Sequence, residues 1–434
     1  MSAAAFLGID IGTSGIRAVC IDKDERELAA YRIAFPSRTP VDGRNEQDPN
    51  LWLPQLDKLL SEVSLALQQF HDGEHQGGYK IAAIAIDGTS STLIACKKDG
   101  TALSPALMYN DQQNQKQAEI ISHFAPAETA VHGASSSLAK ALNLLERHPD
   151  TAILCHQADW LASSLTGEYG ISDENNCLKL GYDSVQQRWP SWLLDNIRIS
   201  LLPEVVPSGS RIGRVKKALI NKYQLADDCS VISGTTDSNA AVLASGASQP
   251  GDAVTSLGST LVLKLFSDRP VFDPQYGIYS HRLDDQWLVG GASNSGGAVL
   301  LQHFSPAQLA EMTPQLKPEK NTGLDYYPLP DTGERFPVND SHKQSRISPR
   351  PGSDLVFFQG LLEGIANIEA EGYKKLEALG TVPVKRIFTA GGGSKNPAWT
   401  KIRERLTGIE ILPAKHSEAC FGSALLARGA CNEK

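Results

Sequence analysis

One local pattern recurs through this chain of 434 residues and limits what it can fold into: a short apolar run, expected to form a β-strand, leads into a glycine and a hydroxyl side chain. The glycine–hydroxyl pairs are Gly12-Thr13, Gly88-Thr89, Gly234-Thr235 and Gly258-Ser259. Stretches with the apolar spacing of a helix, such as residues 51–70 and 138–147, alternate with these strands. Strands that alternate with helices predict an α/β fold.

The strand-and-glycine pattern occurs in both halves of the chain and is interrupted between them. Residues 202–209 are rich in proline and glycine and end a helical stretch, and the pattern restarts at Val231. A chain of this length has room for two or three domains. We therefore predict two α/β domains of related build, residues 1–230 and 231–434. A later passage, residues 313–353, is polar and contains seven prolines, which predicts a long loop.

Charge and composition exclude several classes of protein. The chain has 41 Lys and Arg against 49 Asp and Glu, a formal net charge of −8, without a basic block. We therefore expect neither nucleic acid nor an anionic membrane as a partner. No apolar run approaches the ~20 residues that cross a bilayer, and the N-terminus lacks the basic start of a signal peptide. The seven cysteines include no C-x-x-C pair, so we expect a protein of a reducing compartment, the cytoplasm. For the oligomeric state, we expect either a monomer or a homodimer.

Several familiar sites are absent from the sequence. A P-loop requires Gly-Lys before Ser or Thr, and the chain contains no Gly-Lys pair. Its one G-x-G, at Gly391 and Gly393, is followed by Asn396 where a dinucleotide-binding fingerprint requires glycine. Residues 71–75 read H-x-x-E-H, as in inverted zinc proteases, but the glycines around them predict a surface loop rather than the helix that such a zinc site needs.

The first candidate site follows the first predicted strand. Asp10 ends this strand, and Gly12, Thr13 and Ser14 form the turn after it. Backbone N–H groups and hydroxyls in such a turn can bind phosphate oxygens, whereas a carboxylate would repel them unless it holds a divalent cation. The segment therefore indicates a phosphate site in which Asp10 positions a metal ion. A plain β-hairpin with a glycine turn is the alternative.

A second carboxylate lies in an equivalent place in the other half of the chain. Ser233-Gly-Thr-Thr-Asp237 follows a predicted strand, and Asp237 begins a helix of small residues. A carboxylate at a helix start can be a cap that binds backbone N–H groups. It can also be a general base that takes a proton from an attacking hydroxyl. Two carboxylate–glycine–threonine segments suggest a cleft with a nucleotide on one side and an acceptor on the other.

The third candidate site lies near the C-terminus. A predicted strand ends in Gly391, Gly392 and Gly393, and a helix that carries Trp399 begins after Asn396. Consecutive glycines let a flat ligand approach the backbone, and an asparagine side chain can bind a base or a ribose. The segment therefore indicates a ligand site. A structural strand–turn–helix with Trp399 in the core is the alternative.

Together these segments make the chain resemble the FGGY family of carbohydrate kinases over essentially its whole length. The most specific segment is the C-terminal one, Gly391-Gly-Gly-Ser-Lys-Asn-Pro397. The other segments that carry the resemblance are Asp10-x-Gly-Thr-Ser14, Glu46-Gln-Asp-Pro49, Ile86-Asp-Gly-Thr-Ser90, Leu165-Thr-Gly-Glu168, Gly333-Glu-Arg335 with Pro337, and Glu418-Ala419 with Gly422-Ser-Ala-Leu-Leu-Ala427. The chain is shorter than many members of the family.

The resemblance implies an actin-like (ribonuclease H-like) ATPase fold, in which an N-terminal sugar-binding domain and a C-terminal ATP-binding domain flank a central cleft. Asp237 matches the catalytic base, and Asp10 matches the residue that positions Mg²⁺. The resemblance implies that both carboxylates lie at the sugar and at the metal ion. The residues that match the ATP site are Gly12, Thr13 and Ser14 at the phosphates, Gly258, Ser259 and Thr260 in a second phosphate loop, and Gly391, Gly392, Gly393 and Asn396 at the adenosine. We add Trp399 beside the adenine.

The segment expected near the sugar departs from the pattern of xylulokinases. Where those enzymes usually carry Gly-Gln-Met-His, this chain has Gly88-Thr-Ser-Ser-Thr92. It is more similar to a compact xylulokinase-like subgroup of cyanobacteria and plants, for which D-ribulose is the better-supported substrate. The residues that we then predict at the sugar are Thr89, Ser90, Ser91 and Asp111. Hairpin-turn and helix-cap roles are the alternatives for these side chains.

The sequence therefore predicts ATP-dependent phosphorylation of the terminal hydroxyl of a ketopentose, with D-ribulose giving D-ribulose 5-phosphate. D-xylulose or another polyol is the alternative substrate. The alternative functions are a non-catalytic actin-fold sensor of sugar or nucleotide, and an ATPase that acts on another protein. A sensor can dispense with Asp10 and Asp237, so these two residues favour the kinase.

Overall fold

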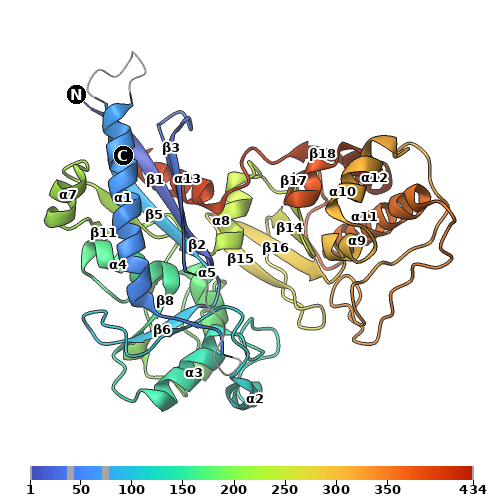
Figure 1. Ribbon diagram of the computed structural model, residues 1–434. Helices are drawn as coiled ribbons and strands as arrows, with labels where there is room; N and C mark the ends of the chain where they lie inside the picture. Colours follow the sequence, from blue (N-terminus) through green and yellow to red (C-terminus); the bar gives the residue numbers. More distant parts are fainter. Residues whose placement is uncertain (1, 37–43, 71–77, 433–434) are drawn as a thin grey trace. The chain divides into compact units, whose positions relative to one another are not determined.

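The structure is a computed structural model that describes residues 2–36, 44–70 and 78–432. Figure 1 shows its helices and strands in chain order. The chain divides into two compact units: the first comprises the residues up to Ala244, Arg282–Asp284 and the chain from Glu418 on, and the second comprises Ser245–His281 and Asp285–Ser417. The H-x-x-E-H segment at residues 71–75 lies outside the described residues.

The division between the units differs from the boundary predicted at residue 231. The strand at which the sequence pattern restarts is β12 (Ser230–Ile232). It pairs in parallel with β5 (Tyr79–Gly88) and so belongs to the sheet of the first unit. The helix after it, α8 (Asp237–Ala244), packs against α13 (Ala419–Asn432), the last helix of the chain. The restarted pattern is therefore a further strand of the first sheet, and the second unit begins after α8.

A six-stranded sheet forms the centre of the first unit, in the order β11-β12-β5-β1-β2-β3. Its other strands are β1 (Ala3–Ile11), β2 (Gly15–Ile21), β3 (Glu27–Ala34) and β11 (Arg211–Arg214). β5 is parallel to both β1 and β12, whereas β2 is antiparallel to β1. The carboxyl ends of β1, β5 and β12 therefore lie at the same edge of the sheet, and residues that follow these strands meet there.

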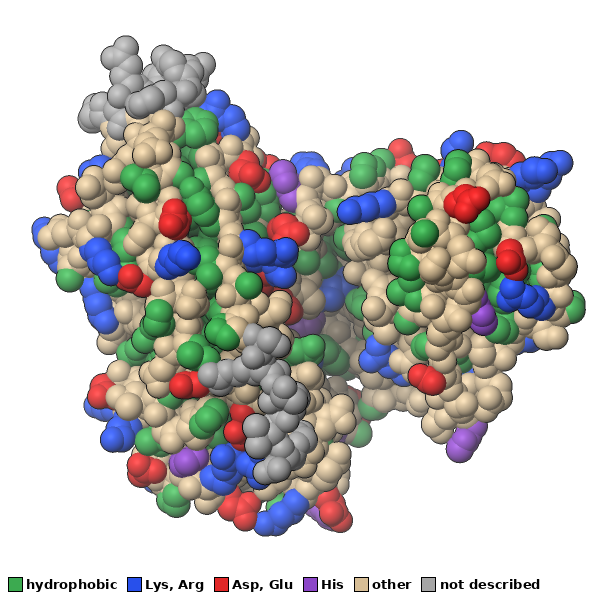
Figure 2. Space-filling model, viewed as in Figure 1, with side chains coloured by type: hydrophobic (Ala, Val, Ile, Leu, Met, Phe, Trp, Pro, Cys, Tyr) green, Lys and Arg blue, Asp and Glu red, His purple; other side chains and the backbone are tan. Residues whose placement is uncertain are grey.

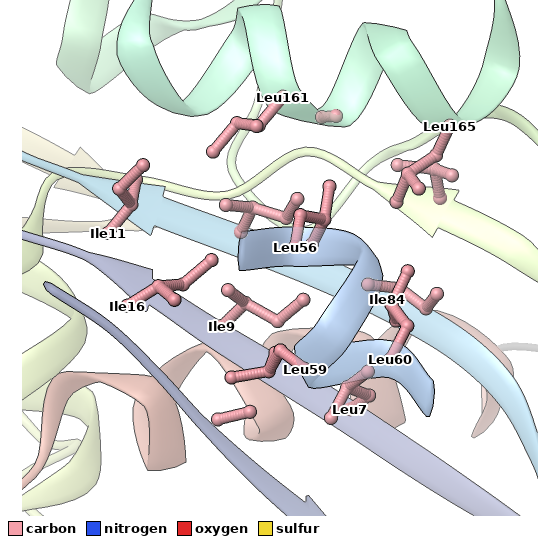
Figure 3. Packing of buried hydrophobic residues seen from close by; sticks show 14 of the residues in the cluster. Leu7, Ile9, Ile11, Ile16, Leu56, Leu59, Leu60, Ile84, Leu161 and Leu165 are labelled. Carbon is pink, nitrogen blue, oxygen red and sulfur yellow. The ribbon is translucent and has the colours of Figure 1, made fainter. Parts of the chain in front are cut away.

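One face of this sheet is covered by bulky apolar residues that pack against two helices. Leu7, Ile9 and Ile11 of β1 point to the same side, because alternate residues of a strand face the same way. Residues of α1 (Trp52–Gln69) and α4 (Gln157–Thr166) pack against them, as Figure 3 shows. The helix predicted from the apolar spacing of this part of the chain is confirmed as α1.

The opposite face carries glycine and alanine beside larger apolar residues such as Phe6 and Val19, and the last helix lies close to it. Gly8 of β1 and Ala83 and Ala85 of β5 occupy this face. A Cβ atom on Gly8 would lie 1.9 Å from the carbonyl oxygen of Cys420 in α13, which is far closer than atoms can approach. Glycine at this position therefore lets α13 pack directly on the strand that ends in Asp10.

The rest of the first unit is built around a smaller sheet. Four strands in the order β4-β7-β6-β8 pack against α3 (Ser137–Arg147), the helix predicted near residue 140, through an apolar cluster that includes Leu93, Leu138 and Leu144. The remaining elements are β4 (Glu46–Gln47), β6 (Leu93–Cys96), β7 (Ala106–Leu107), α2 (Gln115–Ser122), β8 (Ile153–His156), β9 (Ile171–Asp173), α5 (Glu174–Cys177), α6 (Ser191–Leu194), β10 (Glu204–Val206) and α7 (Lys217–Tyr223).

A second six-stranded sheet forms the centre of the second unit, in the order β15-β16-β14-β13-β17-β18. Its strands are β13 (Asp252–Leu257), β14 (Leu261–Ser267), β15 (Tyr279–Leu283), β16 (Gln286–Ser293), β17 (Arg386–Ala390) and β18 (Glu410–Pro413). The helices are α9 (Gly297–His303), α10 (Pro306–Met312), α11 (Asp354–Ala378) and α12 (Pro397–Thr407). As in the first unit, an antiparallel hairpin, β13–β14, lies beside a parallel strand, β17. The predicted related build of the two domains is confirmed.

Residues 313–353 form the long loop predicted from their prolines. After a 3₁₀ turn at Thr313–Gln315, the segment contains only isolated bridges. The buried carboxylate of Glu334 holds it in place, because it accepts hydrogen bonds from the hydroxyl of Ser293 at 2.5 Å and from the backbone N–H of Asn294 at 2.8 Å. Glu334 therefore helps to fix the loop to the end of β16, together with Asn294, which donates to the carbonyl of Gly333, and Ser295, which donates to the carbonyl of Pro328.

A buried ion pair joins helices and strands of the second unit. Arg403 of α12 and Glu369 of α11 are both fully buried and form two hydrogen bonds of 2.6 Å. Glu369 also accepts a hydrogen bond from Thr255 of β13, and Arg403 donates one to Thr389 of β17. Thr255 and Thr389 lie opposite each other in parallel register. The pair thereby fixes two helices to the two strands that lead into the glycine loops of this unit.

The surface carries charges of both signs. On the face shown in Figure 2, acidic and basic side chains are interspersed with apolar and uncharged ones. Within residues 2–36, 44–70 and 78–432, no helix has the length and apolarity that a membrane span requires.

Replacement of Arg403 by Met should destabilise the second unit strongly. The substitution leaves the Glu369 carboxylate buried without its charged partner, and such a loss typically costs about 3–5 kcal/mol. Arg269→Met is the matched control, because Arg269 pairs with Asp268 at an exposed site where an ion pair contributes less than about 1 kcal/mol. Urea unfolding followed by tryptophan fluorescence measures the free energy of unfolding of both variants. Equal losses in the two variants would show that the buried pair contributes little.

Candidate functional site

Three acidic residues meet at one edge of the first sheet. Asp10 ends β1 and is the register partner of Asp87, near the end of the parallel strand β5. Asp237 begins α8 after the turn that follows β12, and an isolated bridge between Gly88 and Thr236 holds this turn beside β5. The two carboxylates predicted from the sequence, Asp10 and Asp237, are thus brought to the same place, and Asp87 lies with them.

The turn before Asp237 lies so close to β5 that the residue at position 234 has no room for a side chain. A Cβ atom on Gly234 would lie 1.8 Å from the carbonyl oxygen of Ile86. Only glycine fits there. The glycine–threonine pattern of this turn therefore has a packing role, which is to place Asp237 next to the strand that carries Asp87.

Asp10 is nearly buried and has a cation beside it. Its Oδ2 accepts a hydrogen bond from Nη1 of Arg17 on β2 at 2.6 Å. The Nε atom of Arg17 lies 3.7 Å from Oε2 of Glu418. Burial raises the pKa of Asp10, and the Arg17 guanidinium offsets this only in part. The sequence reasoning did not single out Arg17. The feature that could have identified Arg17 is its position in the predicted hairpin, where it is the register partner of Asp10.

Asp87 is the candidate residue that sequence reasoning missed. It is completely buried, and its Oδ2 accepts a hydrogen bond from the hydroxyl of Ser423 in α13 at 2.6 Å. Its Oδ1 is buried without a hydrogen-bond partner. Burial, together with the charges of Asp10 and Asp237, raises the pKa of Asp87 well above its usual range. The sequence feature that could have identified Asp87 is an acid close to Gly-Thr at the end of a predicted strand, the same feature that identified Asp10.

The chemistry of these carboxylates fits a magnesium ion. Mg²⁺ prefers oxygen ligands and, in phosphoryl-transfer sites, usually takes one or two carboxylates and completes its shell with water and substrate phosphate. Asp10 and Asp87 are held close together in a buried place with the Arg17 guanidinium on one of them, so a further cation would relieve their repulsion. Among the described residues, no three His, Cys, Asp or Glu side chains are grouped to hold a metal ion by themselves.

The turn after Asp10 is open to solvent. Thr13 and Ser14 are exposed at the tip of the β1–β2 hairpin, and Gly12 donates its N–H to the carbonyl of Gly15 at 2.9 Å. The structure therefore places two accessible hydroxyl side chains next to the acidic residues, as a phosphate site requires. The phosphate role of Gly12, Thr13 and Ser14 stays a prediction.

Three of the predicted sugar-binding residues lie in the turn after β5. Thr89 is buried, and its hydroxyl donates to Oε1 of Gln157 at 2.7 Å. Ser90 is half-buried. Ser91 is buried in a left-handed conformation (φ 67°), and its hydroxyl has no hydrogen-bond partner. Contact of these side chains with a sugar stays a prediction.

Asp111, the fourth predicted sugar-binding residue, is also buried. Its carboxylate accepts hydrogen bonds from the backbone N–H of Asn45 at 3.0 Å and from the side-chain amide of Asn114 at 2.9 Å. These bonds fasten two segments of the chain to each other. The sugar contact predicted for Asp111 therefore requires an oxygen that already has a partner within the protein.

In the second unit, the predicted phosphate loop is the turn between β13 and β14. Gly258 donates its N–H to the carbonyl of Thr260 at 3.2 Å, which closes the turn around the exposed Ser259. The start of α9 supports the loop, because Gly297 donates its N–H to the carbonyl of Gly258 at 2.8 Å. The loop is a hairpin turn like the one after Asp10, and its phosphate role stays a prediction.

The predicted adenosine turn leaves the same edge of the second sheet. It follows β17, which is parallel to β13, so that Ala390 and Ser256 are register partners. Gly391 and Gly392 are exposed, and Gly393 is half-buried. Because the carboxyl ends of parallel strands meet at one edge, the structure brings together the two glycine loops predicted for ATP.

The prediction that Trp399 lies beside the adenine is wrong. Trp399 is 2 % exposed within the apolar cluster of the second unit, and its indole N–H donates to the carbonyl of Leu362 at 3.2 Å. A buried ring whose polar atom is satisfied is a core residue, which was the alternative. Asn396 caps α12 by accepting the backbone N–H of Trp399 at 3.0 Å. Its adenosine role stays a prediction.

Comparison with known proteins assigns both halves of the chain to one family. Residues 5–244 match the N-terminal domain, and residues 253–431 the C-terminal domain, of the FGGY family of carbohydrate kinases. The xylulose kinase of Lactococcus lactis subsp. lactis is similar, at 25% identity over 435 residues, which cover 94% of this chain and 83% of that protein.

Solved structures of sugar and polyol kinases are similar in fold. The ligand-bound xylulose kinase from Lactobacillus acidophilus matches with a TM-score of 0.84 at 18% identity, over 99% of this chain and 90% of that chain. The glycerol kinase of Plasmodium falciparum with ADP matches with a TM-score of 0.83 at 19% identity, over 99% and 90%. The predicted actin-like ATPase fold is confirmed.

Asp87→Asn should stabilise the first unit at neutral pH and leave it almost unchanged near pH 4. Because folding raises the pKa of Asp87 above the ordinary aspartate value of about 3.9, the folded protein keeps a proton there that the unfolded chain releases, and stability falls as the pH rises above that value. Asparagine removes this penalty and keeps an acceptor for Ser423. We expect a gain of about 1–3 kcal/mol at pH 7–8.

Urea unfolding at pH 4 and pH 8 measures this gain. Asp24→Asn is the control, since that side chain is 71% exposed, and should change the free energy of unfolding by less than about 0.5 kcal/mol at either pH. A change in Asp87→Asn that does not depend on pH would contradict the raised pKa.

Proposed function

This chain belongs to the FGGY family of carbohydrate kinases and is an ATP-dependent sugar kinase, and we propose that it converts the ketopentose D-ribulose to D-ribulose 5-phosphate. The terminal hydroxyl oxygen of the sugar attacks the γ-phosphorus of ATP, the bond from that phosphorus to the β–γ bridging oxygen breaks, and ADP leaves. The first unit binds the sugar, and the second binds most of the ATP molecule. The observation that carries the proposal is the position of Asp10 and Asp237 at one edge of the first sheet.

Asp237 acts as the general base in this proposal. It is half-buried in the first turn of α8, and its Oδ1 accepts the N–H of Ser238 at 2.6 Å. A carboxylate held in this way can take the proton of the sugar hydroxyl as its oxygen attacks. Positioning of this kind supplies much of the catalysis in phosphoryl transfer, where little covalent chemistry is left to the protein.

Asp10 holds Mg²⁺ in this proposal, with Asp237 as the second carboxylate. When bound, Mg²⁺ neutralises negative charge that spreads over the phosphate oxygens in the transition state. Arg17 adds a positive charge at the same place through its 2.6 Å contact with Asp10. Thr13, Ser14 and the backbone N–H groups of their turn bind phosphate oxygens.

The glycine loops of the second unit bind the nucleotide in this proposal. The turn around Ser259 takes phosphate oxygens, and the turn at residues 391–393 lies against the adenosine. Both loops leave the carboxyl ends of neighbouring parallel strands, which supports a single ligand that contacts both. The fully buried pair of Arg403 and Glu369 holds the two strands in place through hydrogen bonds with Thr255 and Thr389.

D-ribulose is proposed over D-xylulose because of the turn after β5. Gly88-Thr-Ser-Ser-Thr92 presents short hydroxyl side chains where xylulokinases usually carry Gln-Met-His. Ketopentoses that differ at one carbon are distinguished by single hydrogen bonds, so this exchange bears directly on specificity. Similar proteins that match nearly the whole chain are named xylulose kinases, and D-xylulose is therefore the second candidate.

A substrate panel tests the proposed specificity. ADP release in the presence of Mg-ATP is measured with D-ribulose, L-ribulose, D-xylulose, glycerol and ribitol. We expect the highest kcat/KM with D-ribulose. A higher kcat/KM with D-xylulose would overturn the proposed substrate, and a lack of stimulation by all five would favour a nucleotide-binding sensor.

Asp237→Ala should lower kcat roughly 10²–10⁴-fold, the usual share of a general base, because the sugar hydroxyl loses its proton acceptor. ATP affinity, measured by calorimetric titration, should stay within about twofold of the wild type, since Asp237 lies outside the loops proposed to bind the nucleotide. Asp195→Ala, at an exposed acid of the first unit, is the control. Turnover of Asp237→Ala close to that of the control would rule out the assignment.

Asp10→Asn should raise the Mg²⁺ concentration needed for half-maximal activity and lower kcat, because an amide is a weaker ligand than a carboxylate. A Mg²⁺ titration at saturating ATP and D-ribulose measures this. An unchanged Mg²⁺ dependence would remove Asp10 from the metal site while leaving the kinase activity itself in place.

A further inference from the structure

Lys140 is a lysine that the first unit buries completely. It lies in the first half of α3 and has no exposed surface. Of the lysines among the described residues, it alone is buried. An ammonium group that loses its hydration is stable only where hydrogen-bond acceptors replace water, so a buried lysine implies a built set of acceptors.

The acceptors are the backbone carbonyls of three separate segments. The distances from Nζ to the carbonyl oxygens are 2.8 Å for Ser91, 2.9 Å for Ser135 and 3.3 Å for Tyr109. An ammonium group has three N–H donors, so each donor has a partner. Lys140 therefore joins the turn after β5, the segment after β7 and the segment before α3 at one point.

The turn after β5 needs such support. Ser91 has a left-handed backbone conformation, φ 67°, which costs free energy in a residue other than glycine and persists only where the surroundings hold it. Lys140 holds the carbonyl of this residue, while the Ser91 hydroxyl is buried without a partner. The conformation thus leaves a polar group available in a turn where the sugar is proposed to bind.

The segment after β7 carries a second proposed sugar residue. Asp111 lies two residues beyond Tyr109 and accepts the amide of Asn114 at 2.9 Å, and the same amide donates to the carbonyl of Ala134 at 3.0 Å. The first of these bonds runs to a carboxylate, and the bonds of Lys140 come from an ammonium group. Hydrogen bonds to or from a charged group contribute more than neutral ones, so both side chains help to hold these segments, and Lys140 contacts all three.

We propose that Lys140 is a positioning residue of the sugar site, whose ammonium group holds the Ser91 turn and the Asp111 segment in the arrangement that binds the ketose. The inference rests on the proposed function and extends it to a residue that does not touch the substrate. Because the carbonyls that Lys140 contacts lie outside the segments proposed to bind ATP, loss of Lys140 affects the affinity for sugar and not that for ATP.

Lys140→Met tests this role, because methionine has a similar length and no donor. D-ribulose affinity is measured by calorimetric titration without ATP, and KM is measured for both substrates. We expect the dissociation constant and the KM for D-ribulose to rise about tenfold or more, the effect of losing about one charged hydrogen bond. The KM for ATP should change less than about twofold. An unchanged affinity for D-ribulose would overturn the inference and leave the proposed function standing.

Leu144→Ala is the matched control. Leu144 is fully buried one turn further along α3, and the substitution weakens the packing of the helix without removing a donor. We expect a lower Tm with an almost unchanged affinity for D-ribulose. An equal loss of affinity in Leu144→Ala and Lys140→Met would reduce Lys140 to a general role in stability and overturn the inference.

The pH dependence of the wild type gives a readout that needs no variant. Burial lowers the pKa of Lys140 to about 7, an effect that Asp111 opposes and Lys179 reinforces. Above that pH the amine has two N–H donors for three carbonyls. Affinity for D-ribulose should therefore fall between pH 6 and pH 9 in the wild type and stay level in Lys140→Met. Equal pH profiles would overturn the inference, and wild-type protein that binds no D-ribulose at any pH would overturn the proposed function and this inference with it.

Discussion

The close packing of α13 on the small-residue face of the first sheet is the contact on which the acidic site depends. Because Gly8 has no side chain, the helix lies directly against the strand that ends in Asp10. This contact brings Ser423 to Asp87 and leaves Glu418 beside Arg17. A site whose first acid belongs to the first strand is therefore completed by residues from the last helix.

The electrostatic state of the site follows from this packing. Burial takes water away from Asp10 and Asp87 and raises the pKa of both carboxyl groups, and the charge of Asp10 raises the pKa of Asp87 further. Of these two carboxylates, the guanidinium of Arg17 contacts Asp10 and not Asp87. Folding thus places like charges together at a cost that the rest of the unit must offset, and an added cation reduces the cost. Natural proteins tolerate local conflicts of this kind mainly where function uses them.

The parts of this protein that sequence could predict are those that a local pattern decides. Alternating strands and helices predicted both sheets, and a carboxylate next to Gly-Thr predicted Asp10 and Asp237. The errors concern contacts between distant segments. The predicted boundary at residue 231 failed because β12 joins the first sheet, and Trp399 was misplaced because helix packing, which the turn before it does not reveal, buries its ring. Lys140 is a similar case, since its three acceptors come from segments that are separate in the sequence.

The return of α13 to the first sheet also makes assembly of the acidic site depend on a segment that is synthesised after the second unit. During translation β1, β2 and β3 emerge first, whereas Ser423 leaves the ribosome only after the whole of the second unit. Until then the glycine and alanine face of the first sheet has no helix to cover it, and Asp87 lacks its hydroxyl donor. Asp87 therefore acquires its hydroxyl donor only when α13 has been synthesised and has packed on the first sheet.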